Sequence, residues 1–435
     1  MNVELNAGLS PGDLLILFLV LRVGQLMTER FLSALNRSHW LAAERRDAAA
    51  RTLGITPDDM NKTLAYTKDK YAFGVVSTVT STFVTLMFLA AGGLGFFERL
   101  AIAVAGSQGL VGDGPVVVGI CFFGLLGIAS SLLGLPFELF YTFRLEQKHG
   151  FNRQTFKGFL IDRIKGIVVG VVVGTPVLAL LLWLIQKMGT QWWLYAWAAM
   201  SAVSIFAAWI YPTVLAPLFN KFSPLSEGAL RDGIFALAQK TGFRADGVFV
   251  MDASKRSSHG NAYFTGVFGA KRIVLFDTLV DSMTPPEVVA VLAHELGHFK
   301  LHHVRWGVIR GVVMTGVTFW LMSVFMPMER FYHAFGLAGP SPYGVMVVFG
   351  LWFSVVEFCI HPIGTWLSRR NEFAADRFAR ETLGEAQTLS TALLKLREKS
   401  HAMPVTHPWY SLVYHSHPPM LERVAALKAL HASST

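Results

Sequence analysis

The sequence predicts a mainly α-helical polytopic membrane protein with about seven transmembrane helices and a smaller α+β part outside the membrane. The first observation behind this prediction is composition. Of 435 residues, 53% are hydrophobic and only 15% are charged, whereas a soluble chain carries about 25% charged residues. The second is that apolar runs of about twenty residues, the length that crosses a bilayer, recur along the chain. The third is a long polar region that interrupts these runs late in the sequence.

Seven apolar runs have the length and composition of membrane spans. They cover residues 13–32, 71–97, 115–140, 164–186, 192–214, 304–328 and 343–368. Gly174 and Pro176 predict a kink in the fourth run, because proline has no amide hydrogen and neighbouring helices must satisfy the freed carbonyl group. Cys121 and Cys359 lie inside spans, so we expect neither a disulfide nor a cysteine metal site. No basic region or cleavage sequence precedes the first run, which we expect to remain as an uncleaved anchor.

Basic residues gather in two of the loops between the spans. They are Arg37, Arg45, Arg46, Arg51, Lys62, Lys68 and Lys70 after the first span, and Arg144, Lys148, Arg153 and Lys157 after the third. Because Lys and Arg collect on the cytoplasmic side, we expect these loops and the C-terminus in the cytoplasm and the N-terminus outside. The net charge of +9 is explained by this retention, so no nucleic-acid partner is expected.

Two polar regions, residues 220–303 and 369–435, are expected to form one domain outside the membrane. Within the first, residues 247–251 and 272–276 are short β-branched and aromatic runs beside turn residues, which predict two strands of a small sheet. The chain then divides into residues 1–219 with helices one to five and their cytoplasmic loops, residues 220–303, residues 304–368 with helices six and seven, and residues 369–435.

One helix of the first polar region carries a metal-binding pattern. Thr284, Pro285 and Glu287 predict its start as N-cap, first helical residue and capping-box partner. The helix then contains His294-Glu295-Leu296-Gly297-His298. Histidines four residues apart lie on one face, so both reach a single ion about 2.0–2.1 Å away. Glu295 lies about 100° round the helix, where it contacts a metal-bound water without being a ligand.

A catalytic zinc takes three protein ligands and leaves a fourth position for water, so another segment must supply the third ligand. After the last span, the run from Arg369 looks like the start of a further helix, with Glu372 and Asp376 one turn apart on one face. We select Glu372 as the third ligand and expect Asp376 to accept the second N–H of a ligating histidine. The alternative readings are a solvated acidic face here and an ordinary polar helix face at the two histidines.

Four other residues compete as ligands. His302 and His303 lie on the predicted helix of the motif, but a third ligand from one straight helix cannot close a tetrahedron around the ion. Glu357 and His361 lie at membrane depth in the last span, where ionisable groups usually face a bundle interior or a wet cavity. We expect this second pair to shape a polar cavity rather than to bind the metal.

These motifs resemble those of the type I CAAX prenyl proteases, multi-span membrane zinc metalloproteases that process C-terminally prenylated proteins in eukaryotes and have bacterial relatives. The resemblance covers nearly the whole chain. Besides HELGH it rests on Glu146-Gln147-Lys148-His149-Gly150-Phe151-Asn152, Tyr211-Pro212-Thr213 through Asn220-Lys221-Phe222, Asn261-Ala262-Tyr263-Phe264, Arg370-Asn371-Glu372-Phe373, and His417-Pro418-Pro419 followed by Glu422-Arg423. The sequence departs at His259-Gly260, where eukaryotic members often have His-Ser. We expect no effect of this change on the metal.

The resemblance implies seven transmembrane helices around a large water-filled chamber, with a zincin-like catalytic domain and its zinc site at the cytoplasmic end. It supports Glu372 as the third ligand and implies that Asn261 and His417 flank the zinc and contact the peptide or the developing oxyanion. Without it, these two residues would be a turn asparagine and a surface histidine. The compact loops indicate a bacterial member, which places the protein in the inner membrane with its catalytic domain facing the cytoplasm.

We therefore expect a Zn2+-dependent endopeptidase of the CAAX prenyl protease type. Glu295 takes the proton of a zinc-bound water and passes it to the leaving amine, while zinc and His417 stabilise the oxyanion. An edge strand from Asn261 to Gly266 is expected to pair with an extended peptide. The expected partners are membrane lipids and a peptide or protein substrate that is prenylated or otherwise lipidated.

Two other functions stay open at this point. A membrane quality-control metalloprotease that degrades damaged membrane proteins would share the HExxH site. A transporter or lipid-binding protein would need only a structural zinc, which has four protein ligands and no exchangeable water. The sequence leaves the oligomeric state open.

Overall fold

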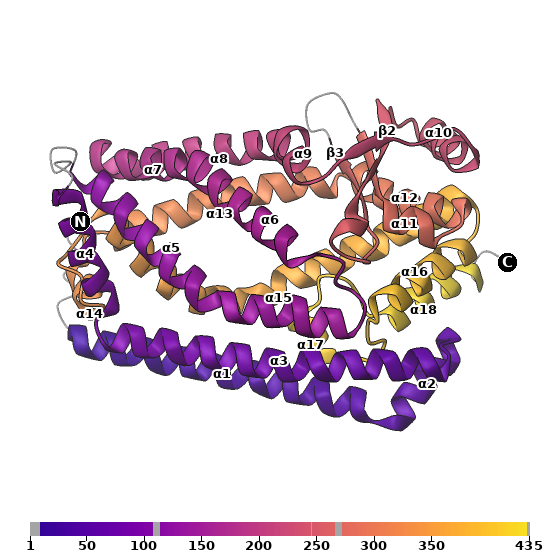
Figure 1. The fold of residues 1–435 in the computed structure, drawn as a ribbon, viewed down its shortest axis with the longest axis horizontal. Helices are drawn as coiled ribbons and strands as arrows, with labels where there is room; N and C mark the ends of the chain where they lie inside the picture. The colour runs from indigo at the N-terminus through magenta and orange to yellow at the C-terminus, as the bar shows by residue number, and fades with distance from the viewer. Residues whose placement is uncertain (1–8, 108–113, 245, 266–271, 433–435) are drawn as a thin grey trace.

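The computed structural model describes residues 9–107, 114–244, 246–265 and 272–432. Its long helices run along the long axis of the molecule, and a small sheet with its covering helices lies at one end (Figure 1). Helices α1 and α3 run along one side, α7 and α8 along the opposite side, and α4 and α14 lie at the end far from the sheet (Figure 1). Most of the chain is therefore a helical shell with an α+β part at one end.

The helices of the membrane part follow the predicted runs closely. They are α1 (Pro11–Leu41), α2 (Ala43–Leu53), α3 (Pro57–Ala90), α4 (Gly93–Ser107), α5 (Pro115–Phe140) with the π turn η2 (Tyr141–Glu146), α6 (Phe156–Val169) with the π turn η3 (Gly170–Gly174) and α7 (Thr175–Lys187), η4 (Gly189–Gln191), α8 (Trp192–Ile210), η5 (Tyr211–Leu215), α9 (Ala216–Phe219), α13 (His303–Phe325), α14 (Glu329–Ala334) and α15 (Pro342–Leu383).

Among the described residues, six helical stretches are long and apolar enough to cross a membrane, and they overlap predicted runs two to seven. The first predicted run lies in α1, which is not in this group and carries Arg22, Glu29 and Arg30. With 31 residues, α1 is about 46 Å long and packs against α3 and α15. Its length therefore also suffices for a span.

The spans are held together at the end far from the sheet. A single apolar core there joins α1, α4, α5, α7, α8, α13, α14 and α15, and its most buried large side chains are Phe18, Phe122, Leu182, Tyr332 and Phe335. Towards the sheet the spans bury little: no residue of α15 between Phe349 and Thr365 is buried, and only 6–28% of the most apolar part of each span is buried. The spans are therefore packed together at the end far from the sheet and only loosely towards it.

The structure corrects the end of the second run and shows the form of the irregularity in the fourth. The second run was expected to continue to residue 97, but α3 ends at Ala90 because Gly92 takes a left-handed conformation with φ of 71°, which ends a helix readily. The irregularity expected at Gly174 and Pro176 is the π turn η3 followed directly by α7. A π turn fits here because proline cannot donate the amide hydrogen of a regular α-helical bond.

The prediction of a new helix from Arg369 is wrong. Helix α15 continues without a break for 42 residues, from the start of the last span to Leu383. Pro362 and Gly364 lie inside it without breaking it, and the helix ends only at Gly384, which takes φ of 81°. Glu372 and Asp376 are therefore carried by the same rigid element that crosses the membrane.

The sheet has four strands in the order β1-β2-β4-β3. They are β1 (Phe222–Pro224), β2 (Gly247–Met251), β3 (Ala262–Thr265) and β4 (Arg272–Phe276), so the two predicted strands, β2 and β4, are confirmed. β2 and β4 are parallel, with Val248 opposite Ile273, whereas β3 runs antiparallel to β4. Among the described residues β3 is an edge strand, and Gly266, the last residue of the predicted edge, lies outside them.

Helices from both polar regions cover this sheet. They are α10 (Ala229–Thr241), α11 (Asp277–Ser282), α12 (Pro285–Lys300), α16 (Gln387–Ser400) and α18 (Met420–Ala432). The short 3-10 turn η6 (Ala253–Lys255) lies beside α11, and α17 (Pro408–Tyr414) packs against α15 and α1 instead. The covering helices pack on the sheet. One apolar core joins them, and Ile234, Leu275, Leu292, Leu389 and Leu427 in it are at most 1% exposed. Residues before and after the last two spans thus share a core, with α12 at its centre.

Candidate metal centre

Helix α12 is fixed at its start and buried along most of its length. The Thr284 amide donates to Glu287 Oε2 at 2.8 Å, and the reciprocal capping bond is also present, which confirms the predicted capping box. Glu287 Oε2 also accepts from Lys395 of α16 at 2.7 Å. These bonds fix the register of the helix, so that His294 lies on a buried face.

Two imidazoles and one carboxylate converge between α12 and α15. His294 Nε2 lies 3.2 Å from His298 Nε2 and 3.5 Å from Glu372 Oε2, and His298 Nε2 lies 3.3 Å from Glu372 Oε1. Ligands about 2.0–2.1 Å from a tetrahedral ion are separated by about 3.3 Å. Glu372 Oε2 is buried without a hydrogen-bond partner, a costly state that a bound cation relieves. The three side chains therefore fit a metal ion.

A buried ion pair supports the first of these histidines. His294 Nδ1 lies 2.8 Å from Asp376 Oδ1, and Arg423 of α18 donates from Nε and Nη2 to the two oxygens of that carboxylate, at 2.8 and 2.6 Å. Arg423 lies in one of the motifs that resemble the family, but the sequence alone predicted no role for it. Burial disfavours the charged imidazole, yet the bonds to Asp376 and Glu372 outweigh it and raise the pKa of His294 to about 9.

Helix α12 comes unusually close to α15 at Gly297. A Cβ atom at Gly297 would lie 3.0 Å from Ala375 Cα and 3.2 Å from its carbonyl oxygen, which is closer than side chains normally approach a backbone. Ala375 lies between Glu372 and Asp376 on α15, so the glycine of the HELGH motif permits the contact that brings the carboxylates to the histidines. This reason for the glycine was not visible in the sequence.

A cavity of about 190 Å³ lies against this centre, and Asn261, His294, Glu295, His417 and Arg423 are among the residues that line it. Burial raises the pKa of the Glu295 carboxyl, although the neighbouring histidines oppose the shift. His417 Nε2 lies 3.3 Å from Glu372 Oε1, and its side chain is 65% exposed. Asn261, Glu295 and His417 thus share one cavity with His294. Asp376, the fourth residue predicted for catalysis, does not line it and contacts His294 Nδ1 instead.

With this geometry in place, the comparisons with known proteins decide the family. Residues 42–221 match the family model described as CAAX prenyl protease N-terminal, five membrane helices, and residues 224–431 match that of peptidase family M48. The chain belongs to peptidase family M48. It is an integral-membrane metalloendopeptidase of the CAAX prenyl protease type, which confirms the resemblance found in the sequence.

Individual relatives are similar to this chain along most of their length. The CAAX prenyl protease 1 homolog of Mus musculus is 36% identical over 447 residues, 92% of each chain. CAAX prenyl protease 1 of Saccharomyces cerevisiae is 38% identical over 328 residues, 72% of each chain. The crystal structure of S. mikatae Ste24p superposes with a TM-score of 0.86 at 32% identity and covers 95% of this chain and 99% of that one.

The competing ligands of the M48 peptidase lie elsewhere. His302 and His303 are not on the motif helix, as the sequence had suggested, because α12 ends at Lys300 and His302 takes a left-handed conformation with φ of 59°. His303 Nδ1 instead lies 3.0 Å from His298 Nδ1, on the far side of that ring. Glu357 and His361 are exposed and lie 4.0 Å apart on α15. Within the described residues, His294, His298 and Glu372 form the one metal-binding group found.

The loop after the third span pairs with the segment that leads to Asn261. Asn152 and Ser257 form an antiparallel bridge, and the Ser258 amide donates to the Phe151 carbonyl at 3.2 Å. The Phe151 ring stacks on His259 with centroids 4.6 Å apart, and His259 Nε2 lies 3.6 Å from the buried Glu146. In the sequence, residues 146–152 of the M48 peptidase stood out only as a family motif. Their contact partners lie about a hundred residues further along the chain.

Proposed function

We propose that His294, His298 and Glu372 hold a zinc ion and that the centre hydrolyses peptide bonds. The observation that carries the proposal is the convergence of two imidazoles and a buried carboxylate, one of which, His294, lines a cavity together with Glu295. Three protein ligands leave a fourth position for water, as catalytic zinc requires. When bound, zinc would polarise the scissile carbonyl and lower the pKa of a water towards about 7.

Glu295 is the proposed general base. Its carboxyl follows His294 on α12 without being a ligand, and a pKa raised by burial favours taking the proton of the attacking water and returning it to the leaving amine. His417 faces the same cavity from the segment before α18 and is proposed to donate a hydrogen bond to the developing oxyanion. Asp376 is the proposed positioning residue that holds His294 in its ligating orientation.

The substrate is proposed to bind along β3. This strand pairs with β4 on one side only, among the described residues, and Asn261 directly precedes it at the cavity. An extended peptide that adds to such an edge gains main-chain hydrogen bonds irrespective of its sequence, and Asn261 is proposed to contact it. The relatives are named CAAX prenyl proteases, so we propose a protein with a prenylated C-terminus as the substrate class.

The orientation in the membrane is also a proposal. Helix α2, which carries Arg45, Arg46 and Arg51, lies at the same end of the molecule as the sheet and α12 (Figure 1). Because basic loops are retained in the cytoplasm, this supports a metal centre that faces the cytoplasm, in a bacterial inner membrane. The proposed division is residues 1–219 and 304–368 as membrane parts, and residues 220–303 and 369–435 as the catalytic parts.

The proposal is tested by metal analysis and by cleavage of a prenylated C-terminal peptide with the purified full-length protein. We expect about one zinc per wild-type chain, retained zinc without cleavage in Glu295→Gln, and loss of both in Glu372→Ala. Glu357→Gln is the matched control, since this exposed carboxylate lies on the same helix as Glu372 and should change neither readout. Wild-type cleavage by Glu295→Gln would contradict the assigned base, and preference for an unfolded membrane protein would favour a quality-control role.

A further inference from the structure

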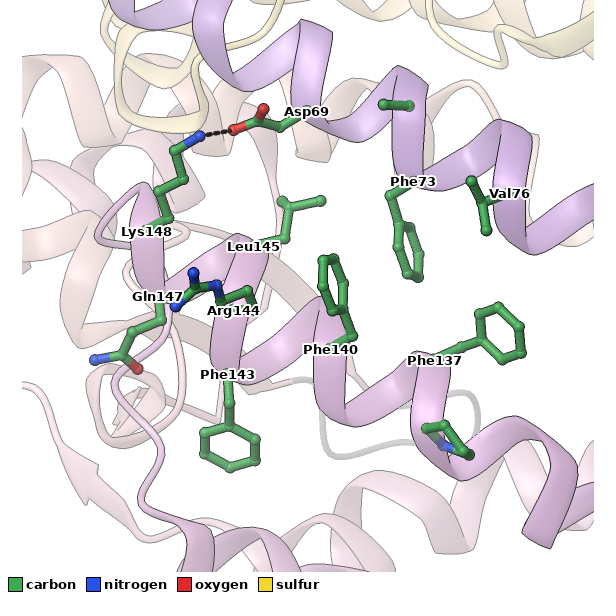
Figure 2. A pocket seen from close by; sticks show the side chains of 12 residues that line it. Asp69, Phe73, Val76, Phe137, Phe140, Phe143, Arg144, Leu145, Gln147 and Lys148 are labelled. Atoms are coloured by element: carbon green, nitrogen blue, oxygen red, sulfur yellow. Dashed lines mark hydrogen bonds and ion pairs between the residues drawn. The ribbon is translucent and has the colours of Figure 1, made fainter.

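One cavity among the described residues is separate from the metal centre. It has a volume of about 900 Å³ and lies between α3 and the region where α5 becomes η2 (Figure 2). None of the residues that line the metal-centre cavity lines this one. A volume of this size is typical of sites for drug-sized or cofactor-sized ligands, and no part of the proposed peptidase mechanism uses it.

One part of the cavity is an apolar groove between two membrane spans. Phe73 and Val76 of α3 face Phe137 and Phe140 of α5 across it (Figure 2). The rings of Phe73 and Phe140 are parallel with centroids 5.8 Å apart, yet Val76 is 59% exposed and Phe140 53% exposed. Aromatic and aliphatic surface left open inside the membrane-spanning part matches a hydrocarbon chain rather than a polar ligand.

The other part of the cavity is cationic. Arg144, Gln147 and Lys148 line it together with Asp69, and Lys148 Nζ lies 2.6 Å from the Asp69 carboxylate (Figure 2). Arg144 takes part in none of the ion pairs found among the described residues. Two cations against one carboxylate leave a net positive charge where the third span meets its basic loop. Basic pockets between membrane helices are typical sites for anionic lipid headgroups.

The helix geometry opens this space. Pro136 lies within α5 and lines the cavity, and five residues later the helix becomes the π turn η2. Both features interrupt regular α-helical hydrogen bonding, and π turns in helices frequently occur at functional sites. Because the same turn carries Arg144, the cationic part and the apolar groove are built by one irregular stretch of the third span.

We propose that this cavity is a binding site for an anionic phospholipid. An acyl chain lies in the groove beside Phe73, Val76, Phe137 and Phe140, and the headgroup phosphate accepts hydrogen bonds from Arg144 and Lys148. A zwitterionic lipid would meet the same groove, but its headgroup carries no net charge to balance the cations. A free phosphate would bind the cations but leave the apolar groove exposed. A prenyl thioether would fill the groove but has no charge to pair with Arg144 and Lys148.

The experiment measures binding of dioleoyl phosphatidylglycerol and of dioleoyl phosphatidylcholine to the purified full-length protein by native mass spectrometry. We expect the anionic lipid to bind more tightly. Arg144→Gln and Lys148→Gln should each weaken it about fivefold, the factor equivalent to ~1 kcal/mol per cation, without affecting phosphatidylcholine. The matched control is Arg153→Gln with Lys157→Gln, which removes two cations from the same loop that do not line the cavity.

The acyl-chain part of the proposal is tested with Phe140→Ala. This change should weaken both lipids, since it removes aromatic surface from the groove and leaves the cations in place. Equal binding of the two lipids by the wild type, or equal losses in the loop control, would overturn the site. So would displacement of phosphatidylglycerol by inorganic phosphate alone, or by a farnesylated peptide at equal concentration. Because no cleavage is measured, the result is independent of the proposed peptidase function.

Discussion

Replacing Asp376 with asparagine should weaken zinc binding without removing any proposed ligand. Asp376 Oδ1 lies 2.8 Å from His294 Nδ1, and Arg423 binds both carboxylate oxygens. Asparagine keeps the size of the side chain but loses the negative charge that makes His294 a stronger ligand. It also offers Arg423 one acceptor oxygen in place of two. The position and the basicity of one ligand therefore change together.

The expected loss is large enough to measure. Changing a partner that orients a metal-binding histidine typically costs 10–100-fold in metal affinity, or about 1.4–2.8 kcal/mol. We expect a loss near the upper end of this range, because Asp376 and Arg423 are both buried and a buried charge left without its partner is costly. Zinc affinity is measured by competition with a chromogenic chelator, in wild type and variant at the same pH.

A matched control separates this effect from general damage to the catalytic part. Asp252→Asn removes a carboxylate that pairs with Lys255 beside β2, away from the metal centre, and should leave zinc affinity unchanged. The melting temperature of each zinc-free protein shows whether Asp376→Asn still folds. If a folded Asp376→Asn protein binds zinc within twofold of wild type, the carboxylate has no positioning role.

Three further predictions concern the supports of the centre. Gly297→Ala should lower zinc affinity and cost about 1–3 kcal/mol of stability, checked by chelator competition and thermal melting, because its Cβ would press on the α15 backbone. Glu287→Gln should destabilise the protein at pH 7. Burial raises the pKa of the Glu287 carboxyl, but the bonds from Lys395 and Thr284 outweigh it and lower that pKa. The stabilisation by Glu287 is therefore present above the unfolded pKa of about 4.3 and is lost as pH falls through the lower folded pKa, which melting curves of wild type and variant from pH 7 to pH 3 should resolve. Glu146→Gln should raise KM about fivefold with zinc content unchanged, because it loosens the segment before Asn261 rather than the metal; an equal change in metal content would rule this out.

Local signals explain which parts of the structure were predictable. The start of α12 was predicted because Thr284, Pro285 and Glu287 act within one turn, and the strands β2 and β4 because each is a short apolar run between turn residues. Glu372 was selected from spacing on a helix face. The continuity of α15 was missed because polar sequence after a span suggests a new element, although neither a capping bond nor a glycine separates the two parts.

Contacts between distant residues explain what was not predictable. Arg423 meets Asp376 from 47 positions away, and nothing in either local sequence pairs them. Gly297 resembles any small residue of a buried helix face until α15 is placed against it. The loop from Glu146 to Asn152 was conspicuous as a motif, but its pairing with Ser257 and His259 depends on how the third span meets the sheet.

The length of α15 explains why the chain after it is needed for the metal centre. Thirty residues separate Pro342 from Glu372, about 45 Å of helix. A pivot of 1° at the far end therefore moves the Glu372 carboxylate by about 0.8 Å, more than the ~0.5 Å that a functional site tolerates. The packing at the far end of the spans cannot fix Glu372 to that precision.

The restraint must act close to the ligand, and the segment around α17 and α18 supplies it. Thr365 Oγ1 donates to the Leu412 carbonyl at 2.7 Å, and Arg369 Nη1 donates to the Ser411 and His415 carbonyls, each at 2.8 Å. One turn beyond Glu372, Arg423 binds Asp376 from α18. Bonds on both sides of Glu372 tie α15 to the C-terminal segment that presents His417, so this segment should also determine whether the proposed metal ligands can meet.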